Sequence, residues 1–145
     1  MKKLTSLQAF NAVGRLLQIY FDKKPSSDLA TILGSMSFLR NKKTADDAMW
    51  EIWTECLDKI FITKRLRNYN HLTVLQAFLG MGEFLEEYFG TTDVEPIINF
   101  LEQNAKLATE HKKIDVTLWR NWLQCVDEVF SVKDSRMYLR LRKPN

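Results

Sequence analysis

The sequence predicts an all-α fold in which two tandem three-helix repeats, related by a pseudo-twofold axis, pack as one helical domain. The phrase LTSLQAF, which begins at Leu4, returns as LTVLQAF at Leu72. A second phrase, WEIWTECLDKIF from Trp50, returns as WRNWLQCVDEVF from Trp119. Apolar residues in both copies recur at spacings of three and four, as in amphipathic helices. An internal repeat of this length indicates a duplicated structural unit.

The extent of the match gives the repeat boundaries. The offset between the copies is 68 residues in the first phrase and 69 residues in the second. We assign repeat one to residues 4–61, a linker to 62–71, repeat two to 72–130 and a basic tail to 131–145. The 145 residues have the size of one typical domain. Strand-like alternation occurs only in the tail, at Met137, Leu139 and Leu141.

The first element of each repeat is expected to be a long helix with a capping box. Thr5 is a natural N-cap, and Gln8 can return a hydrogen bond to its backbone. Thr73 and Gln76 repeat the same pair. The apolar face of the first copy consists of Leu7, Phe10, Val13, Leu17, Tyr20 and Phe21.

A glycine interrupts this helix at the same position in both copies, at Gly14 and Gly82. Each should cost about 1 kcal/mol relative to alanine. We expect the compensation to be close approach of another helix, and the alternative is a ligand against the backbone.

The middle element should be a shorter helix. Apolar residues follow Ser27 in the first repeat and Asp93 in the second, where Pro96 suits a first helical turn. These residues are Leu29, Ile32, Leu33 and Met36 in the first repeat and Val94, Ile97, Ile98 and Leu101 in the second.

The last element of each repeat is expected to be a helix capped by Asp46 or Asp115. Its apolar positions carry tryptophans and one cysteine in each copy: Trp50, Trp53, Cys56, Leu57 and Ile60, and then Trp119, Trp122, Cys125, Val126 and Val129. Tryptophans at this spacing usually fill a core rather than form a stacking platform. We expect Cys56 and Cys125 to be buried and reduced.

Targeting and catalytic signals are both missing. No apolar run reaches the roughly 20 residues of a membrane span, and the amino terminus lacks a signal-peptide pattern, so we expect a cytoplasmic protein. The two histidines, His71 and His111, have no His or Cys at ligand spacing, which argues against a zinc site. No phosphate loop or nucleophile elbow occurs. We expect no enzymatic activity, no metal and no cofactor.

The formal net charge of +3 is unevenly distributed along the chain. Repeat one has seven basic and seven acidic residues, whereas repeat two has four basic and ten acidic. The remaining segments have ten basic residues and one acidic, with basic runs at 64–67 and 136–143. These runs could contact nucleic-acid phosphates, but we favour the simpler explanation that they aid solubility or fold back against the acidic repeat.

Acidic residues form two organised groups that are candidates for a partner-binding surface. In the last helix of repeat one, Asp47, Glu51, Glu55 and Asp58 recur at spacings of four, four and three, and so share a face. The equivalent positions in repeat two are Val116, Arg120, Gln124 and Asp127, so building the unit does not require the acidic stripe. The second group, Glu83, Glu86 and Glu87, lies on the polar face of the first helix of repeat two. A solvated helix face is the simpler alternative for both groups.

The segment SDLATILGSMSFLRNKKTADDAMWEIW, from Ser27 to Trp53, together with LTSLQAF before it and ECLDKI after it, resembles bacterial immunity proteins. These are paired with toxins of contact-dependent growth inhibition and related polymorphic toxin systems. The resemblance covers most of repeat one, whereas repeat two lacks the LGSM and KTAD features. It implies a protein that binds the C-terminal domain of a cognate secreted toxin and blocks it. Such toxins are often nucleases, whose basic surfaces an acidic immunity surface could cover.

The sequence thus favours toxin neutralisation in the cytoplasm, by stoichiometric binding and without membrane contact. The alternative is a helical nucleic-acid-binding protein that uses the basic linker and tail, and we consider nucleic acid the less favoured partner.

Overall fold

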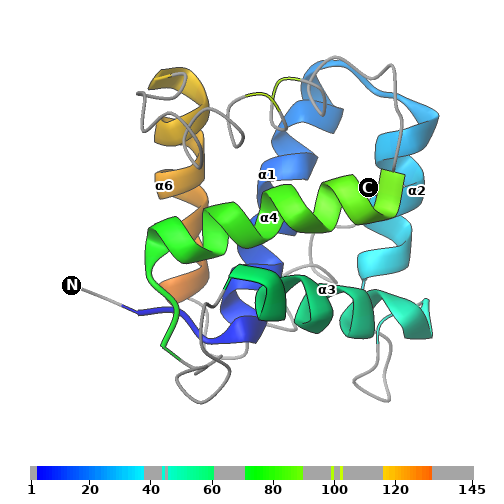
Figure 1. Cartoon of the computed structure of the whole chain (residues 1–145). Coiled ribbons are helices and arrows are strands. Elements are labelled where there is room, and N and C mark those ends of the chain that lie inside the picture. Colours follow the sequence, from blue (N-terminus) through cyan, green and yellow to red (C-terminus); the bar gives the residue numbers. More distant parts are fainter. Residues whose placement is uncertain are drawn as a thin grey trace.

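The computed structural model describes residues 3–37, 44, 46–60, 71–89, 99, 102 and 116–131. The chain is all-helical over these residues and forms no sheet. The helices are α1 (Ser6–Lys23), α2 (Ser27–Met36), α3 (Asp47–Ile60), α4 (Val74–Phe89) and α6 (Val116–Phe130), shown in Figure 1. Asn99 and Glu102, the two described residues between α4 and α6, are also helical. The described helices confirm the all-α character that the sequence predicts.

Capping boxes start the first helix of each repeat, as predicted. The Gln8 amide donates to Thr5 Oγ1 over 3.0 Å, and the Thr5 amide donates to Gln8 Oε1 over 2.9 Å. Both corresponding bonds between Thr73 and Gln76 measure 2.9 Å. Each box satisfies two backbone N–H groups that would otherwise have no partner within the helix.

Short polar side chains also cap the next two helices. The N-cap of α2 is Ser26, whose Oγ accepts from the Leu29 amide, so the helix already includes Ser27. Asp46 caps α3 as predicted, because its Oδ1 accepts from the Ala48 amide over 3.0 Å. The matching residue of the second copy, Asp115, lies outside the described residues.

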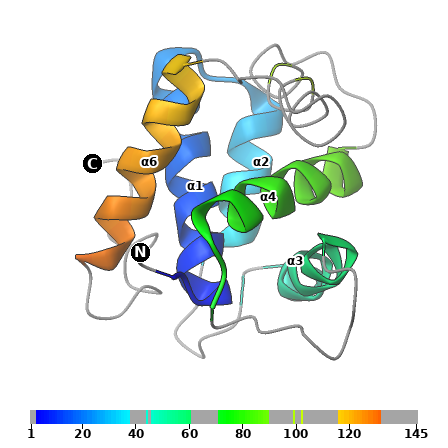
Figure 2. The same ribbon diagram turned by 60° about the vertical axis from the view of Figure 1, so that its left-hand side comes forward.

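Helix packing connects the two halves of the chain. The most extensive contacts join α3 to α4 and α1 to α6. The first helix of each repeat therefore packs against the last helix of the other repeat. Figure 2 shows α6 and α3 at opposite sides of the molecule, with α1 and α4 between them. A two-residue antiparallel bridge adds to this connection, because the backbones of Leu4 and Leu72 exchange hydrogen bonds of 2.8 Å in both directions.

Equivalent residues of the two copies make the same contacts in the core. Trp53 Nε1 donates to the Ser6 carbonyl over 3.1 Å, and Trp122 Nε1 donates to the Val74 carbonyl over 3.2 Å. Both indoles are fully buried, so these bonds satisfy donors that water cannot reach.

The aromatic contacts around them match as well. The ring centroids of Phe10 and Trp50 are 5.4 Å apart with an interplanar angle of 75°, and those of Phe78 and Trp119 are 5.3 Å apart at 73°. Such edge-to-face pairs stabilise a core beyond the area that they bury. Trp53 and Trp122 are thus core residues, as the sequence predicted, and Trp50 and Trp119 are partly buried and pack against the core.

No helix of the described residues has the length and apolar character needed to span a membrane. The basic runs at 64–67 and 136–143, the alternating tail residues and His111 lie outside the described residues.

Candidate partner-binding surface

The α3–α4 pair positions the acidic residues that the sequence singled out. At Gly80, a Cβ atom would lie 3.0 Å from Leu57 Cδ2 and 3.4 Å from Trp53 Cη2. The missing side chain therefore lets α4 approach α3 closely. The sequence predicted such an approach at Gly14 and Gly82, which are both buried. Gly80 was missed because the other copy has alanine, Ala12, at the same position.

The acidic stripe of α3 faces solvent over most of its length. Glu51 and Glu55 are exposed, and Asp58 is partly buried. Asp47 is the first residue of the helix, and its side chain lies outside the part of the chain that the structure describes. The opposite side of α3 contributes Met49, Trp53, Cys56 and Leu57 to the core, so the helix is amphipathic.

The acidic group of α4 has a similar arrangement. Glu86 and Glu87 are exposed and Glu83 is partly buried, while Phe84 and Leu85 face the core. The prediction that these carboxylates point away from the core is confirmed for Glu86 and Glu87. Glu83 and Asp58 are the partly buried members of the two groups.

Lys59 connects the two acidic groups. Its Nζ lies 3.5 Å from Glu87 Oε2, with about half of each side chain exposed. Glu87, with a smaller contribution from Glu83, raises the pKa of Lys59. The distance and the shift both place the α4 carboxylates beside the end of α3.

Cys56 lies beneath the same region. Burial raises the pKa of its thiol to about 11; nearby Lys59 opposes the shift, whereas Glu87, Glu83 and Glu55 add to it. The thiol therefore responds to carboxylates from both helices. Cys56 and Cys125 are both buried and free, as predicted.

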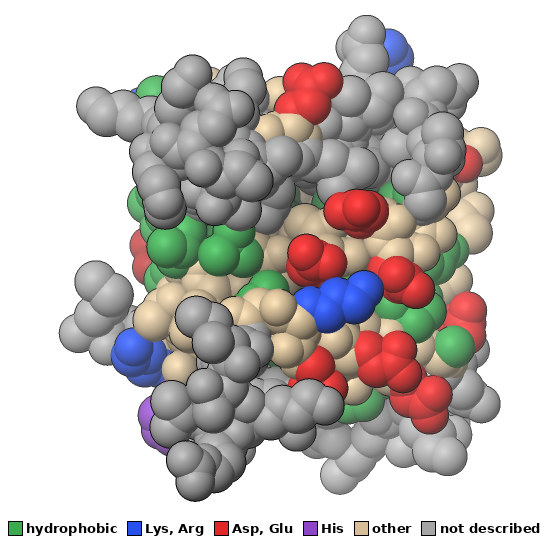
Figure 3. Space-filling view, viewed as in Figure 1, with side chains coloured by type: hydrophobic (Ala, Val, Ile, Leu, Met, Phe, Trp, Pro, Cys, Tyr) green, Lys and Arg blue, Asp and Glu red, His purple; other side chains and the backbone are tan. Residues whose placement is uncertain are grey.

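The sequence treated the two acidic groups as alternatives, but the structure brings them onto one surface. We call this surface the acidic face and define it by Glu51, Glu55, Asp58, Lys59, Glu83, Glu86 and Glu87. It has six carboxylates and one ammonium group. Figure 3 shows acidic side chains gathered over α3 and α4. Sequence spacing identifies each stripe, whereas their proximity depends on tertiary packing.

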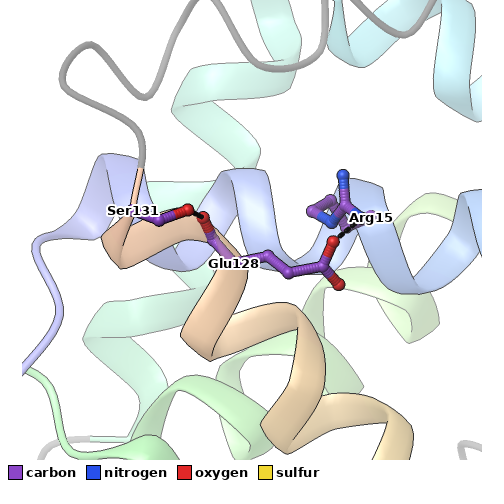
Figure 4. A network of polar contacts seen from close by, with 3 residues as sticks. All are labelled: Arg15, Glu128 and Ser131. Atoms are coloured by element: carbon purple, nitrogen blue, oxygen red, sulfur yellow. Dashed lines mark hydrogen bonds and ion pairs between the residues drawn. The ribbon is translucent and has the colours of Figure 1, made fainter.

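The charge at the other main helix contact is arranged differently. Arg15 of α1 forms an ion pair with Glu128 of α6, and Figure 4 shows this pair across the two helices. The Arg15 side chain is 11% exposed, so the contact is largely shielded from water. The Glu128 carbonyl also accepts from Ser131 Oγ over 2.7 Å at the end of α6. These carboxylate and guanidinium groups hold helices together rather than face a partner.

The described residues contain no group of three or more His, Cys, Asp or Glu side chains placed to hold a metal ion. His71 is exposed. Comparison with known proteins finds no matching family model, no curated protein and no solved structure that is significantly similar.

Proposed function

We propose that this chain is an immunity protein that neutralises a cognate secreted toxin by binding the toxin's C-terminal domain on the acidic face. The observation that carries the proposal is the convergence of two separate acidic groups on one exposed surface. Like charges at helical spacing repel one another by a few tenths of a kcal/mol per pair. Repulsion within each stripe therefore opposes folding slightly, and binding a cationic surface would offset this repulsion.

The acidic face is suited to fast association with a basic protein. Its six carboxylates lie on two adjacent helices, so their fields add at one place. Electrostatic complementarity of this kind raises association rates and suppresses wrong partners. We propose that the toxin is a nuclease with a basic substrate-binding surface, and that this protein acts in the cytoplasm by binding and not by catalysis.

We also infer that the fold consists of two tandem three-helix repeats related by a pseudo-twofold axis. The paired indole hydrogen bonds, the paired aromatic contacts and the reciprocal helix packing support this inference. The Leu4–Leu72 bridge joins equivalent residues, as expected near such an axis.

The test uses charge reversal on each half of the acidic face. The first step is to look for an adjacent upstream gene that ends in a secreted-toxin module, and the C-terminal domain of that protein is the probe. A genome without such a neighbour would count against the proposal. Glu51→Lys with Glu55→Lys, and separately Glu83→Lys with Glu87→Lys, should each slow association by about tenfold or more and weaken protection of cells. The loss should shrink at high salt, because salt screens exposed charges.

The matched control is Asp22→Lys with Asp28→Lys, which changes the net charge equally but lies on α1 and α2. This variant should bind and protect nearly as well as the parent. If both acidic-face variants fold normally and still protect fully, the interface lies elsewhere. Salt-sensitive binding to bulk duplex DNA, without binding to the toxin domain, would instead support the nucleic-acid alternative.

A further inference from the structure

The described surface has a second unusual feature, which is a strip of exposed apolar side chains on α6. Among the residues that the structure describes, three large hydrophobic side chains are exposed: Leu75 (44%), Val116 (66%) and Leu123 (39%). Val116 and Leu123 belong to α6, and Leu75 lies at the start of α4, which contacts α6. Figure 3 shows hydrophobic side chains on the α6 side of the molecule, near the start of α4.

The exposed residues of α6 follow the spacing of a helix-pairing seam. Val116, Arg120, Leu123 and Asp127 succeed one another at intervals of four, three and four, and all four are exposed. This is the interval at which residues line one side of a paired helix. The opposite side of α6 packs into the core through Leu118, Trp122, Cys125 and Val129. We call the exposed row the α6 seam.

The fold itself does not explain the α6 seam. In α3, the equivalent helix of the other repeat, the same positions are Asp47, Glu51, Thr54 and Asp58. That helix is built without an apolar outer row. The apolar side chains of α6 are thus an addition to one repeat, and they leave hydrophobic surface in contact with water.

The charges of the α6 seam are self-complementary, because the seam of one chain matches the seam of a second chain that runs in the opposite direction. Arg120 and Asp127 lie seven residues apart, about 10 Å along the helix, which is too far for a direct ion pair within one chain. The midpoint between them lies beside Leu123. If a second α6 packs antiparallel across this midpoint, Arg120 of each copy faces Asp127 of the other and the two Leu123 side chains meet.

We propose that the α6 seam pairs with the α6 seam of a second copy of this chain, in an antiparallel contact with twofold symmetry. Such a contact is isologous, because each copy supplies the same surface. A single pair of helices buries little area, so the dimer should be weak and depend on concentration. The α6 and α3 helices lie at opposite sides of the molecule in Figure 2, so dimer formation leaves the acidic face open. The proposal therefore stands independently of the proposed toxin binding.

The test is sedimentation equilibrium of the full chain between about 1 µM and about 1 mM, the range expected for a small interface. The parent should shift from monomer to dimer within this range. Arg120→Asp and Asp127→Arg should each weaken the dimer by about tenfold or more, because each places like charges opposite one another. The double variant Arg120→Asp with Asp127→Arg should restore the parent dimer constant.

Two further variants locate the contact. Leu123→Ser should weaken the dimer, whereas Glu51→Arg, at the α3 position equivalent to Arg120, should leave it unchanged. A chain that stays monomeric at all these concentrations would overturn the proposal. That result would also be expected if a different protein covered the seam. A dimer unaffected by the single charge variants, or a double variant no better than the single ones, would overturn it as well.

Discussion

At the scale of single residues, the last helix of each repeat carries a buried indole N–H donor and a buried thiol. Trp53 and Trp122 place their indole N–H groups on equivalent carbonyls, and the cysteine three residues later is buried in both copies. The sequence predicted buried indoles and thiols from their spacing. It did not predict the indole hydrogen bonds, because the acceptors lie 47 or 48 residues away along the chain.

The thiol of Cys56 should be unreactive in the folded protein. Burial, as the main cause, raises its pKa to about 11, so almost no thiolate exists at pH 8. A bulky disulfide reagent at pH 8 should label neither Cys56 nor Cys125 until denaturant is added. Rapid labelling of both thiols in the native protein would contradict their burial.

The same shift makes stability depend on pH in the alkaline range. The pKa of the Cys56 thiol is 9.0 in the absence of the fold and about 11 within it. The stabilisation from this group is fully present below pH 9 and is lost as the pH rises towards 11. The free energy of unfolding should therefore fall between pH 9 and 11, and Cys56→Ala should flatten that fall.

At the scale of helices, the two main contacts have opposite charge arrangements. Arg15 of α1 pairs with Glu128 of α6. The equivalent positions in the α4–α3 contact are Glu83 and Lys59, so the acid and the base have changed places. With this arrangement each first helix is electrostatically matched to the last helix of the other repeat, and pairing it with its own would bring like charges together.

Charge-reversal variants of Arg15 and Glu128 test how much this ion pair contributes to the stability of the fold. Arg15→Glu and Glu128→Lys should each lower the free energy of unfolding by about 1–3 kcal/mol, because a largely shielded charge loses its partner. The double variant should recover most of the loss. Urea denaturation of all four proteins gives the coupling energy, and a double variant with the sum of the two losses would show that the charges do not interact.

Two glycines in helices should respond to substitution in opposite ways. Gly34 has open space where a Cβ would lie, so Gly34→Ala should stabilise the protein by about 0.5–1 kcal/mol. Gly80 faces Leu57 at 3.0 Å, so Gly80→Leu should force α3 and α4 apart and cost about 1–3 kcal/mol. In thermal unfolding, the melting temperature should rise for Gly34→Ala and fall for Gly80→Leu. Equal effects at both positions would contradict the close approach at Gly80.

At the scale of the whole molecule, local signals predicted the helices, and tertiary packing determined the surface. The capping boxes, the apolar faces and the repeat itself are local patterns, so the sequence was sufficient for the fold class. The acidic face is different, because its two halves come from helices in different repeats. Nothing in the spacing of Glu51 and Glu83 indicates that α3 packs against α4. The sequence pattern says even less about the identity of the partner, because complementarity also depends on the surface of another protein.

The central claim is that a cationic toxin domain docks on the acidic face. The most direct test is to titrate the isotopically labelled chain with that domain and to monitor the amide chemical shifts of the chain by NMR. We expect the largest perturbations at the outer residues of α3 and α4, around Glu51, Glu55 and Glu87, with α2 and α6 nearly unchanged. Perturbations concentrated on α6 or α2, with α3 and α4 unaffected, would contradict the claim.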